Sequence, residues 1–415
     1  MNHGRFRSIW TRLVILLSVI GPGIITANVD NDAGGITTYS VAGAQYGYEL
    51  LWLMPLVAVA LVIVQEMSAR LGVVTGKGLA DLIRESLGVR LTSLILCVLL
   101  FANLANTISE FAGVAASMEI FGVSKFISVP VAAVVVWFLL VKGSYRIVER
   151  VFLVASALYL TYVASGFMAR PHWPEVLRAF HTVRFRMEPG FLIMAVTIIG
   201  TTIAPWMQFY QQSSVVDKGL KASDMGYERL DVIIGSVFAI FVAVFITISC
   251  AATLYAGNLS IATAKDAALA LRPLAGSYAA TLFAFGLLNA SLFSAAILPL
   301  STAYVVCEAF GWESGMDRRV RQAPVFYGIY TAFIVIGAGV ILLPLRSLVA
   351  TMLVSQTLNG VLLPLVLLVM LRLVNDRRIM GRYANGPVLN VISWVIVAAL
   401  IGLTLLLILS SFMHL

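Results

Sequence analysis

The sequence predicts an all-α membrane protein with many transmembrane helices, and its composition, apolar segments and basic loops each indicate that class. Of its 415 residues, 60% are hydrophobic and only 12% are charged. A soluble domain is roughly 45–50% apolar and about 25% charged, so this chain has too little polar surface to cover a soluble globule. The same composition excludes a disordered chain, a coiled coil and a disulfide scaffold, and the three cysteines show no metal-binding or redox spacing.

Eleven apolar segments are candidate membrane spans, because a helix needs about 20 mostly apolar residues to cross a bilayer. They lie at 12–44, 48–70, 91–118, 127–142, 147–169, 190–213, 230–256, 277–306, 323–344, 347–374 and 387–411. The sequence shows no linker or low-complexity tract, so we expect a single transmembrane domain over residues 1–415.

Basic residues are concentrated in alternate loops. The net charge is +8, and 20 of the 28 Lys and Arg residues fall in the N-terminal segment or in the loops after every second span. The positive-inside rule therefore places the N-terminus in the cytoplasm and, with an odd number of spans, the C-terminus outside the cell membrane. Because the charge has this explanation, we expect the lipid bilayer, and not nucleic acid, as the partner of the basic segments.

The longest polar stretch, residues 170–189, divides the first ten spans into two blocks of five. Since five is odd, the second block must enter the membrane upside down relative to the first, which is the topology of inverted repeats in many secondary transporters. We expect repeat 1 over 12–169, repeat 2 over 190–374 and an additional helix over 387–411.

The middle of the first span is too polar for a passive helix. Asp30 and Asp32 lie there and are followed by Gly34 and Gly35. A charge at the bilayer centre costs on the order of 2.5–3.5 kcal/mol, and each glycine weakens a helix by roughly 1 kcal/mol. An unwound stretch beside a polar cavity would explain both, because freed carbonyls and a carboxylate can hold a cation. A re-entrant loop or a polar contact between helices is the alternative.

The first span of the second block is interrupted in a similar way. Thr201 and Thr202 come shortly before Pro205, and a proline removes a backbone donor and clashes with the preceding turn. Alone, this pattern indicates a simple proline kink as readily as a functional break. Two broken helices at matching places in two halves together indicate the binding site of a transporter.

Several segments resemble the NRAMP family of divalent-metal transporters. They are Gly-Pro-Gly at 21–23, Ala-Gly-Ala-Gln-Tyr-Gly-Tyr-Glu-Leu-Leu-Trp at 42–52, Gln-Glu-Met-Ser-Ala-Arg-Leu-Gly-Val-Val-Thr-Gly at 65–76, Ile-Gly-Thr-Thr at 199–202 and Ser-Gln at 355–356. The resemblance covers most of the chain. It implies the LeuT fold, which has two inverted five-helix repeats with the first helix of each one broken.

The resemblance also implies roles for residues at the two breaks, and here the chain departs from the family. Asp32 keeps the aspartate of the Asp-Pro-Gly-Asn signature, but Gly35 stands where that signature has its ligating Asn. In the Met-Pro-His signature, Pro205 is kept, Ala204 replaces the thioether ligand and Trp206 replaces the histidine that the family links to proton movement.

Two further spans contain matching positions. In the third span the family often has an Asp three residues before a Glu, and these positions are Thr107 and Glu110 here. In the tenth span Gln356 matches the glutamine that joins the family's metal site. The losses at Trp206 and Thr107 therefore suggest transport that is not coupled to protons.

These replacements change the expected ligand chemistry. Thioethers favour softer transition metals, whereas carboxylate, amide and water oxygens suit hard ions such as Mg²⁺. Losing the Met and Asn side chains also removes bulk, so we expect a wider site. We expect Asp32 and Gln356 as ligands, helped by backbone carbonyls near Val29 and Thr201, around a Mg²⁺ ion that keeps several waters.

Two more carboxylates are candidates for the cation path. Asp30 either faces the path or bonds to nearby backbone amides or an Arg, and the sequence favours neither alternative. Glu110 shares one helix face with Asn103 and Asn106, which indicates either an acidic lining of the path or a polar seam between helices. All four histidines lie in terminal or outer-loop segments, so this topology provides no intramembrane histidine relay for protons.

The sequence therefore predicts a secondary transporter that moves Mg²⁺, with Mn²⁺ also accepted, by alternating access and without proton coupling. The alternatives are a proton-coupled Mn²⁺ or Fe²⁺ transporter, an amino-acid or organic-cation transporter on the same fold, and a receptor or structural membrane protein. We expect no enzyme activity and no nucleotide as energy source, because hydrolytic and nucleotide-binding motifs are missing from the sequence. We also expect no bound cofactor, and the sequence implies no obligate protein partner.

Overall fold

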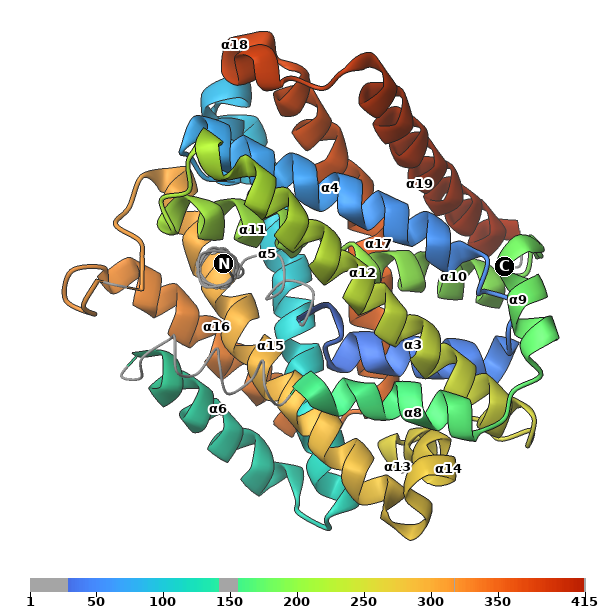
Figure 1. The fold of residues 1–415 in the computed structure, drawn as a ribbon. Coiled ribbons are helices and arrows are strands. Elements are labelled where there is room, and N and C mark those ends of the chain that lie inside the picture. The colour runs from blue at the N-terminus through green and yellow to red at the C-terminus, as the bar shows by residue number, and fades with distance from the viewer. Residues whose placement is uncertain (1–28, 142–155, 317, 414–415) are drawn as a thin grey trace, which may run out of the picture.

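Figure 1 shows the computed structural model as an assembly of helices, with no strand in the residues that the structure describes, namely 29–141, 156–316 and 318–413. Eight helical segments within these residues are long and apolar enough to cross a membrane, and two shorter apolar helices accompany them. The predicted all-α membrane class is confirmed.

Within the described residues, each predicted span overlaps a helix, and the span 190–213 is divided between two helices. The first block contains α3 Ala33–Tyr46, α4 Leu53–Thr75, α5 Leu79–Ile120, α6 Lys125–Val141 and α8 Leu160–Met168, with the 3₁₀ turn Ser156–Tyr159 before α8. The first parts of the predicted spans 12–44 and 147–169, and the Gly-Pro-Gly segment at 21–23, lie outside the described residues.

The second block contains α10 Pro189–Thr202, α11 Pro205–Asp217, α12 Met225–Cys250 with the π-helical turn Ala251–Tyr255, α15 Ala279–Phe310, α16 Pro324–Leu342 and α17 Leu348–Asn375. The additional helix is α19 Pro387–Met413. Within the described connections lie four short helices, namely α9 Trp173–His181, α13 Ala264–Ala268, α14 Arg272–Ala275 and α18 Arg377–Met380. One-turn 3₁₀ helices occur at Ala222–Asp224, Leu269–Leu271, Gly276–Tyr278 and Gly381–Tyr383.

α5 is longer than its predicted span, because it contains 42 residues and begins at Leu79 instead of residue 91. Gly88 interrupts it with a φ of 77°, a conformation that glycine adopts without a Cβ clash. The segment before Gly88 is polar and includes an ion pair between Arg84 and Asp81 at 3.4 Å. The apolar span itself therefore follows Gly88, close to where the sequence predicts it.

α3 lies inside the bundle, where it packs against α12, α17, α10 and α5 (Figure 1). Glycines allow this close packing. A Cβ on Gly43 of α3 would lie 2.4 Å from the Thr247 carbonyl oxygen of α12, and a Cβ on Gly113 of α5 would lie 2.4 Å from the Ala33 Cβ. Since 12 of the 14 residues of α3 are buried, the polar residues at its start lie in the protein interior and not in lipid.

Loops that the sequence assigns to one side of the membrane lie together. The Arg84 guanidinium, after the second span, donates to the Ala309 carbonyl at the end of the eighth span at 2.9 Å. Arg70, at the end of the second span, donates to the Asn385 side chain after the tenth span at 2.6 Å. These contacts agree with alternating sides, while the cytoplasmic position of that side stays a prediction.

Candidate functional site

The first helix break lies directly before α3. Val29 and Asp30 are helical, Asn31 forms a turn, and Asp32 is extended with φ −69° and ψ −175°. α3 then begins at Ala33. Asp32 caps it, because its Oδ1 accepts a hydrogen bond from the Gly35 amide at 2.6 Å. An aspartate at this position satisfies an amide that the first helical turn leaves unpaired, which stabilises the break.

The second break separates α10 from α11. Ile203 (φ −124°, ψ 62°) and Ala204 (φ −67°, ψ 140°) are the residues outside helical conformation. Pro205 is the first residue of α11, a position where its missing N–H and fixed φ cost nothing. The sequence prediction of an interrupted helix is confirmed, and the interruption is a complete separation of two helices instead of a simple kink.

Two carboxyl groups meet at the start of α3. The Ala33 amide donates to Oε2 of Glu110 from α5 at 3.2 Å, which brings the Glu110 carboxyl group beside that of the neighbouring Asp32. Both residues are buried, with 5% and 0% of their surface exposed. Two carboxyl groups in contact repel each other when both are ionised, so the pair is stable with a shared proton or with a cation between them.

Three different oxygens surround Gly35. A Cβ on this residue would lie 2.5 Å from the Asp30 carbonyl oxygen and 3.4 Å from both Asp32 Oδ1 and Thr201 Oγ1. Thr201 contributes its hydroxyl, which is buried and makes no hydrogen bond with the described residues. A backbone carbonyl is also present, as predicted near Val29, although it belongs to the next residue.

The expectation that Gly35 widens the site is wrong for this structure. The space that an Asn side chain would need there is occupied by the Asp30 backbone. Gly35 thus permits a close approach of the backbone to the start of α3, which is a different physical role from leaving an open chamber.

Gln356 of α17 reaches the same group with its amide nitrogen. Its Oε1 accepts a hydrogen bond from Asn359 Nδ2 at 2.9 Å. Its Nε2 lies against Gly34, where a Cβ would be 1.9 Å away, on the side of Asp32, and it has no hydrogen-bond partner among the described residues. The family resemblance implies an oxygen from Gln356 at this point, but in this arrangement the oxygen faces Asn359 instead.

Of the two alternatives that the sequence left open for the Asp30 side chain, the structure does not show bonding to backbone amides or to an Arg. Asp30 is 2% exposed, and neither carboxyl oxygen has a hydrogen-bond partner among the described residues. A buried carboxylate without partners is costly, so it favours a cation nearby or a bound proton. This placement makes Asp30 a candidate for attracting a cation through its charge.

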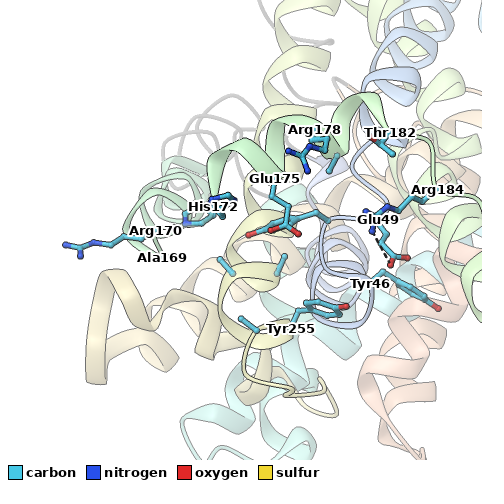
Figure 2. A pocket seen from close by; sticks show the side chains of 16 residues that line it. Tyr46, Glu49, Ala169, Arg170, His172, Glu175, Arg178, Thr182, Arg184 and Tyr255 are labelled. Carbon is cyan, nitrogen blue, oxygen red and sulfur yellow. Dashed lines mark ion pairs between the residues drawn. The ribbon is translucent and has the colours of Figure 1, made fainter.

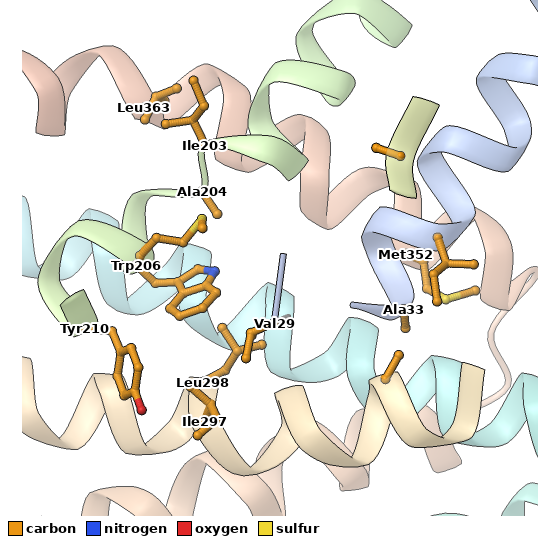
Figure 3. Close-up of a cluster of buried hydrophobic side chains, with 14 of the residues drawn as sticks. Val29, Ala33, Ile203, Ala204, Trp206, Tyr210, Ile297, Leu298, Met352 and Leu363 are labelled. Carbon is orange, nitrogen blue, oxygen red and sulfur yellow. The ribbon is translucent and has the colours of Figure 1, made fainter. Parts of the chain in front are cut away.

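The other side of the break is apolar. Figure 3 shows the Trp206 indole facing Val29 and Leu298, with Ala204 close by. Trp206 is 2% exposed and stacks at an angle on Tyr210, with ring centroids 6.1 Å apart. An indole has one N–H and no basic nitrogen, so it cannot accept and pass on a proton as histidine does.

Thr107 lies on another side of α5. Its hydroxyl donates to the Asn103 carbonyl at 2.8 Å within the helix, and its methyl group packs against Gly337 of α16. The structure therefore does not bring Thr107 to the Asp32 group, whereas Glu110 on the next turn does reach it.

Across the part of the chain that the structure describes, no three His, Cys, Asp or Glu side chains gather as in a metal cage. The site instead combines two carboxyl groups with neutral oxygens from helix breaks. Sequence reasoning gave no role to Asn359. The spacing of three residues between Gln356 and Asn359 on one helix was the available signal for it.

A separate cavity of about 620 Å³ lies beside the C-terminal end of α3. Figure 2 shows Glu49 and Glu175 near its centre, with Tyr46 and Tyr255 below them. Glu49 is already paired with Arg186 at 2.5 Å. The cavity lies at the C-terminal end of α3 and Asp32 lies at its N-terminal end. The 14 residues of this helix, each rising about 1.5 Å, therefore separate the cavity from Asp32.

The chain matches the family model "Natural resistance-associated macrophage protein-like" (Nramp) over residues 23–410. It is 30% identical to a divalent metal cation transporter MntH from Aeromonas hydrophila over 407 residues, which cover 93% of this chain and 94% of the relative. A second MntH, from Ralstonia nicotianae, is 29% identical over 407 residues and covers 93% and 89% of the two chains.

Solved structures show the same fold. A manganese transporter from Eremococcus coleocola superposes with a TM-score of 0.76 at 22% identity, covering 99% of this chain and 88% of that one. MHP1, a nucleobase-cation-symport-1 family transporter, has a TM-score of 0.59 at 14% identity, with coverage of 94% and 92%. The predicted LeuT-like fold is confirmed. Family model, relatives and fold together show that this multi-pass membrane protein belongs to the Nramp family.

Proposed function

We propose that the protein carries divalent metal cations across the cell membrane by alternating access, with partly hydrated Mg²⁺ as main substrate and Mn²⁺ also accepted. The observation that carries this proposal is the group of oxygens from Asp30, Asp32 and Thr201 around Gly35, next to the Glu110 carboxyl group. Helix breaks in matching halves are where secondary transporters hold their ions. The moving parts would be the repeats 12–169 and 190–374.

The donor chemistry favours a hard ion. The groups assembled at the breaks are carboxyl, carbonyl and hydroxyl oxygens, which suit Mg²⁺ better than soft metals. Asp32 already uses Oδ1 to cap α3, which leaves Oδ2 as its main donor to a cation. Mg²⁺ fits such a sparse site because it is commonly held by one or two carboxylates and keeps several waters.

In this proposal Asp32 is the main charged ligand and Glu110 its partner. Thr201 and the Asp30 carbonyl complete the polar side, while Ala204 and Trp206 form the apolar side. With no basic side chain at residue 206, the ion would move downhill without an obligatory proton. A negative cytoplasm favours uptake of a divalent cation by about 4.6 kcal/mol per 100 mV, twice the value for one charge.

A second candidate is proton-coupled transport of Mn²⁺, for which the names of the relatives support the ion. Both cited MntH proteins are named divalent metal cation transporters, and the cited structure from Eremococcus coleocola is that of a manganese transporter. The carboxyl pair of Asp32 and Glu110 also offers a place where a proton and a metal ion compete. The same flux experiment separates the two candidates.

The test is uptake of Mg²⁺, Mn²⁺ and Ca²⁺ into proteoliposomes while a trapped dye follows internal pH. The wild-type protein should take up Mg²⁺ at unchanged pH, and Asp32→Asn should lose uptake while remaining folded. Asp224→Asn, in a connecting 3₁₀ turn, is the matched control and should transport normally. Acidification that follows Mn²⁺ uptake would instead support the coupled candidate. Absence of any metal flux would leave an organic substrate on this fold.

A further inference from the structure

Behind Gln356 lies a chain of three side-chain amides that joins α17 to α5. Asn359 Nδ2 donates to Gln356 Oε1 at 2.9 Å and to Asn106 Oδ1 at 2.9 Å. Asn106 Nδ2 donates back to Asn359 Oδ1 at 3.0 Å. All three residues are buried, with 1% or less of their surface exposed, so water does not substitute for these bonds.

This chain determines which end of the Gln356 amide faces Asp32. With its oxygen held by Asn359, Gln356 turns its NH₂ group toward Gly34 and Asp32 at the start of α3, where this group has no hydrogen-bond partner among the described residues. A donor suits a carboxylate but repels a cation, which requires the amide oxygen. For Gln356 to become a metal ligand, its amide must therefore turn over.

Gln356 cannot turn over alone at low cost. Its NH₂ group would then meet the NH₂ group of Asn359, and a buried hydrogen bond would be lost. If Asn359 turns as well, its oxygen accepts from Gln356, but it then meets the oxygen of Asn106. If all three turn together, every hydrogen bond is restored with donor and acceptor exchanged.

We propose that Asn359 and Asn106 are positioning residues that reverse together with Gln356 and so switch its amide between an Asp32-facing donor and a cation-facing acceptor. This proposal rests on the function proposed above and adds two residues that set the affinity of that site. The relay couples the ion to α5 and α17 without any change in charge.

The decisive variant is Asn359→Asp. A carboxylate accepts but does not donate, so Gln356 must turn its NH₂ group to residue 359 and its oxygen to the site. We expect Asn359→Asp to bind Mg²⁺ about fivefold more tightly than Asn106→Asp does, as measured by calorimetry on the purified full chain. Asn106→Asp adds the same charge one link farther away, without contact to Gln356, and is the matched control.

Combining Asn359→Asp with Gln356→Leu shows whether the tighter Mg²⁺ binding acts through the Gln356 amide. In Gln356→Leu the amide is absent, so the excess tightening by Asn359→Asp should disappear. Equal tightening by the two Asp variants, or an excess that persists in Gln356→Leu, would overturn the relay. If the wild-type protein and Asp32→Asn both fail to bind Mg²⁺, the proposed function fails instead, and the two failures are thereby distinguished.

The relay also has a test that needs no variant at residue 359. Nitrogen-15 spectra of side-chain amides in the wild-type protein should show the signals of Gln356, Asn359 and Asn106 shifting together as Mg²⁺ is added. Asn103, which donates to Thr302 at 2.9 Å outside the relay, should stay unchanged. A shift of Gln356 alone would contradict concerted reversal.

Discussion

Replacing Gly35 by alanine tests whether the close approach of the backbone builds the cation site. A Cβ at this position would lie 2.5 Å from the Asp30 carbonyl oxygen, and contacts under 3.0 Å are essentially never observed for real Cβ atoms. The carbonyl must therefore retreat by about 0.5 Å or more. The obstacle is backbone and cannot rotate away as a flexible side chain would.

Gly35→Ala has two opposing effects on the free energy of unfolding. Overpacking of this kind costs about 1–3 kcal/mol, of which alanine recovers about 0.5–1 kcal/mol through its higher helix propensity. We expect the free energy of unfolding to fall by about 1–2 kcal/mol. Displacing oxygens around a metal typically weakens its binding by about 10–100-fold, so Mg²⁺ affinity should fall within that range.

The assay is calorimetric titration with Mg²⁺, combined with thermal unfolding in the same detergent. Gly286→Ala is the matched control, because Gly286 is a buried glycine of α15 and its Cβ would meet nothing within 4 Å. This control should keep wild-type affinity. Unchanged Mg²⁺ affinity in Gly35→Ala, with the protein folded, would refute the idea that this approach forms the site.

Three other substitutions test separate parts of the account. Ala204→Met introduces a thioether at the second break and should raise Mn²⁺ uptake relative to Mg²⁺ uptake by about tenfold in competition assays. An unchanged ratio would show that residue 204 does not set selectivity. Glu110→Gln keeps an acceptor for the Ala33 amide, so it should stay as stable as wild type while Mg²⁺ binding weakens by about tenfold; wild-type affinity would remove Glu110 from the site. Glu308 accepts from Ser213 at 2.5 Å, and its carboxyl group lies against Gly78 directly before α5, so Glu308→Ala should lower the free energy of unfolding by about 1–2 kcal/mol, and an unchanged melting temperature would argue against a stabilising role of this contact.

The positions of the helix breaks could be predicted from sequence because they follow from local chemistry. Two carboxylates and two glycines cannot be accommodated in a passive transmembrane helix, and the structure ends the break at Asp32. Pro205 similarly marks the start of a new helix, since its missing N–H is harmless only in the first turn. Helix ends of this kind depend on the residues themselves.

The internal geometry of the site could not be predicted in the same way. The orientation of Gln356 depends on Asn106, which is far away in sequence and meets Asn359 only through packing of α5 on α17. The width expected at Gly35 was wrong, because a missing side chain reveals the volume removed but not the path of the neighbouring backbone. Such features arise from tertiary contacts.

The central claim is that a divalent cation binds where the two helix breaks meet. Anomalous diffraction from crystals soaked with Mn²⁺ locates the ion directly, without reliance on any variant. The account predicts one strong peak beside Asp32, close to Gly35 and Thr201, that disappears in crystals of Asp32→Asn. A peak confined to another place, such as the cavity beside Glu49, or a peak that survives the Asp32 substitution, would contradict it.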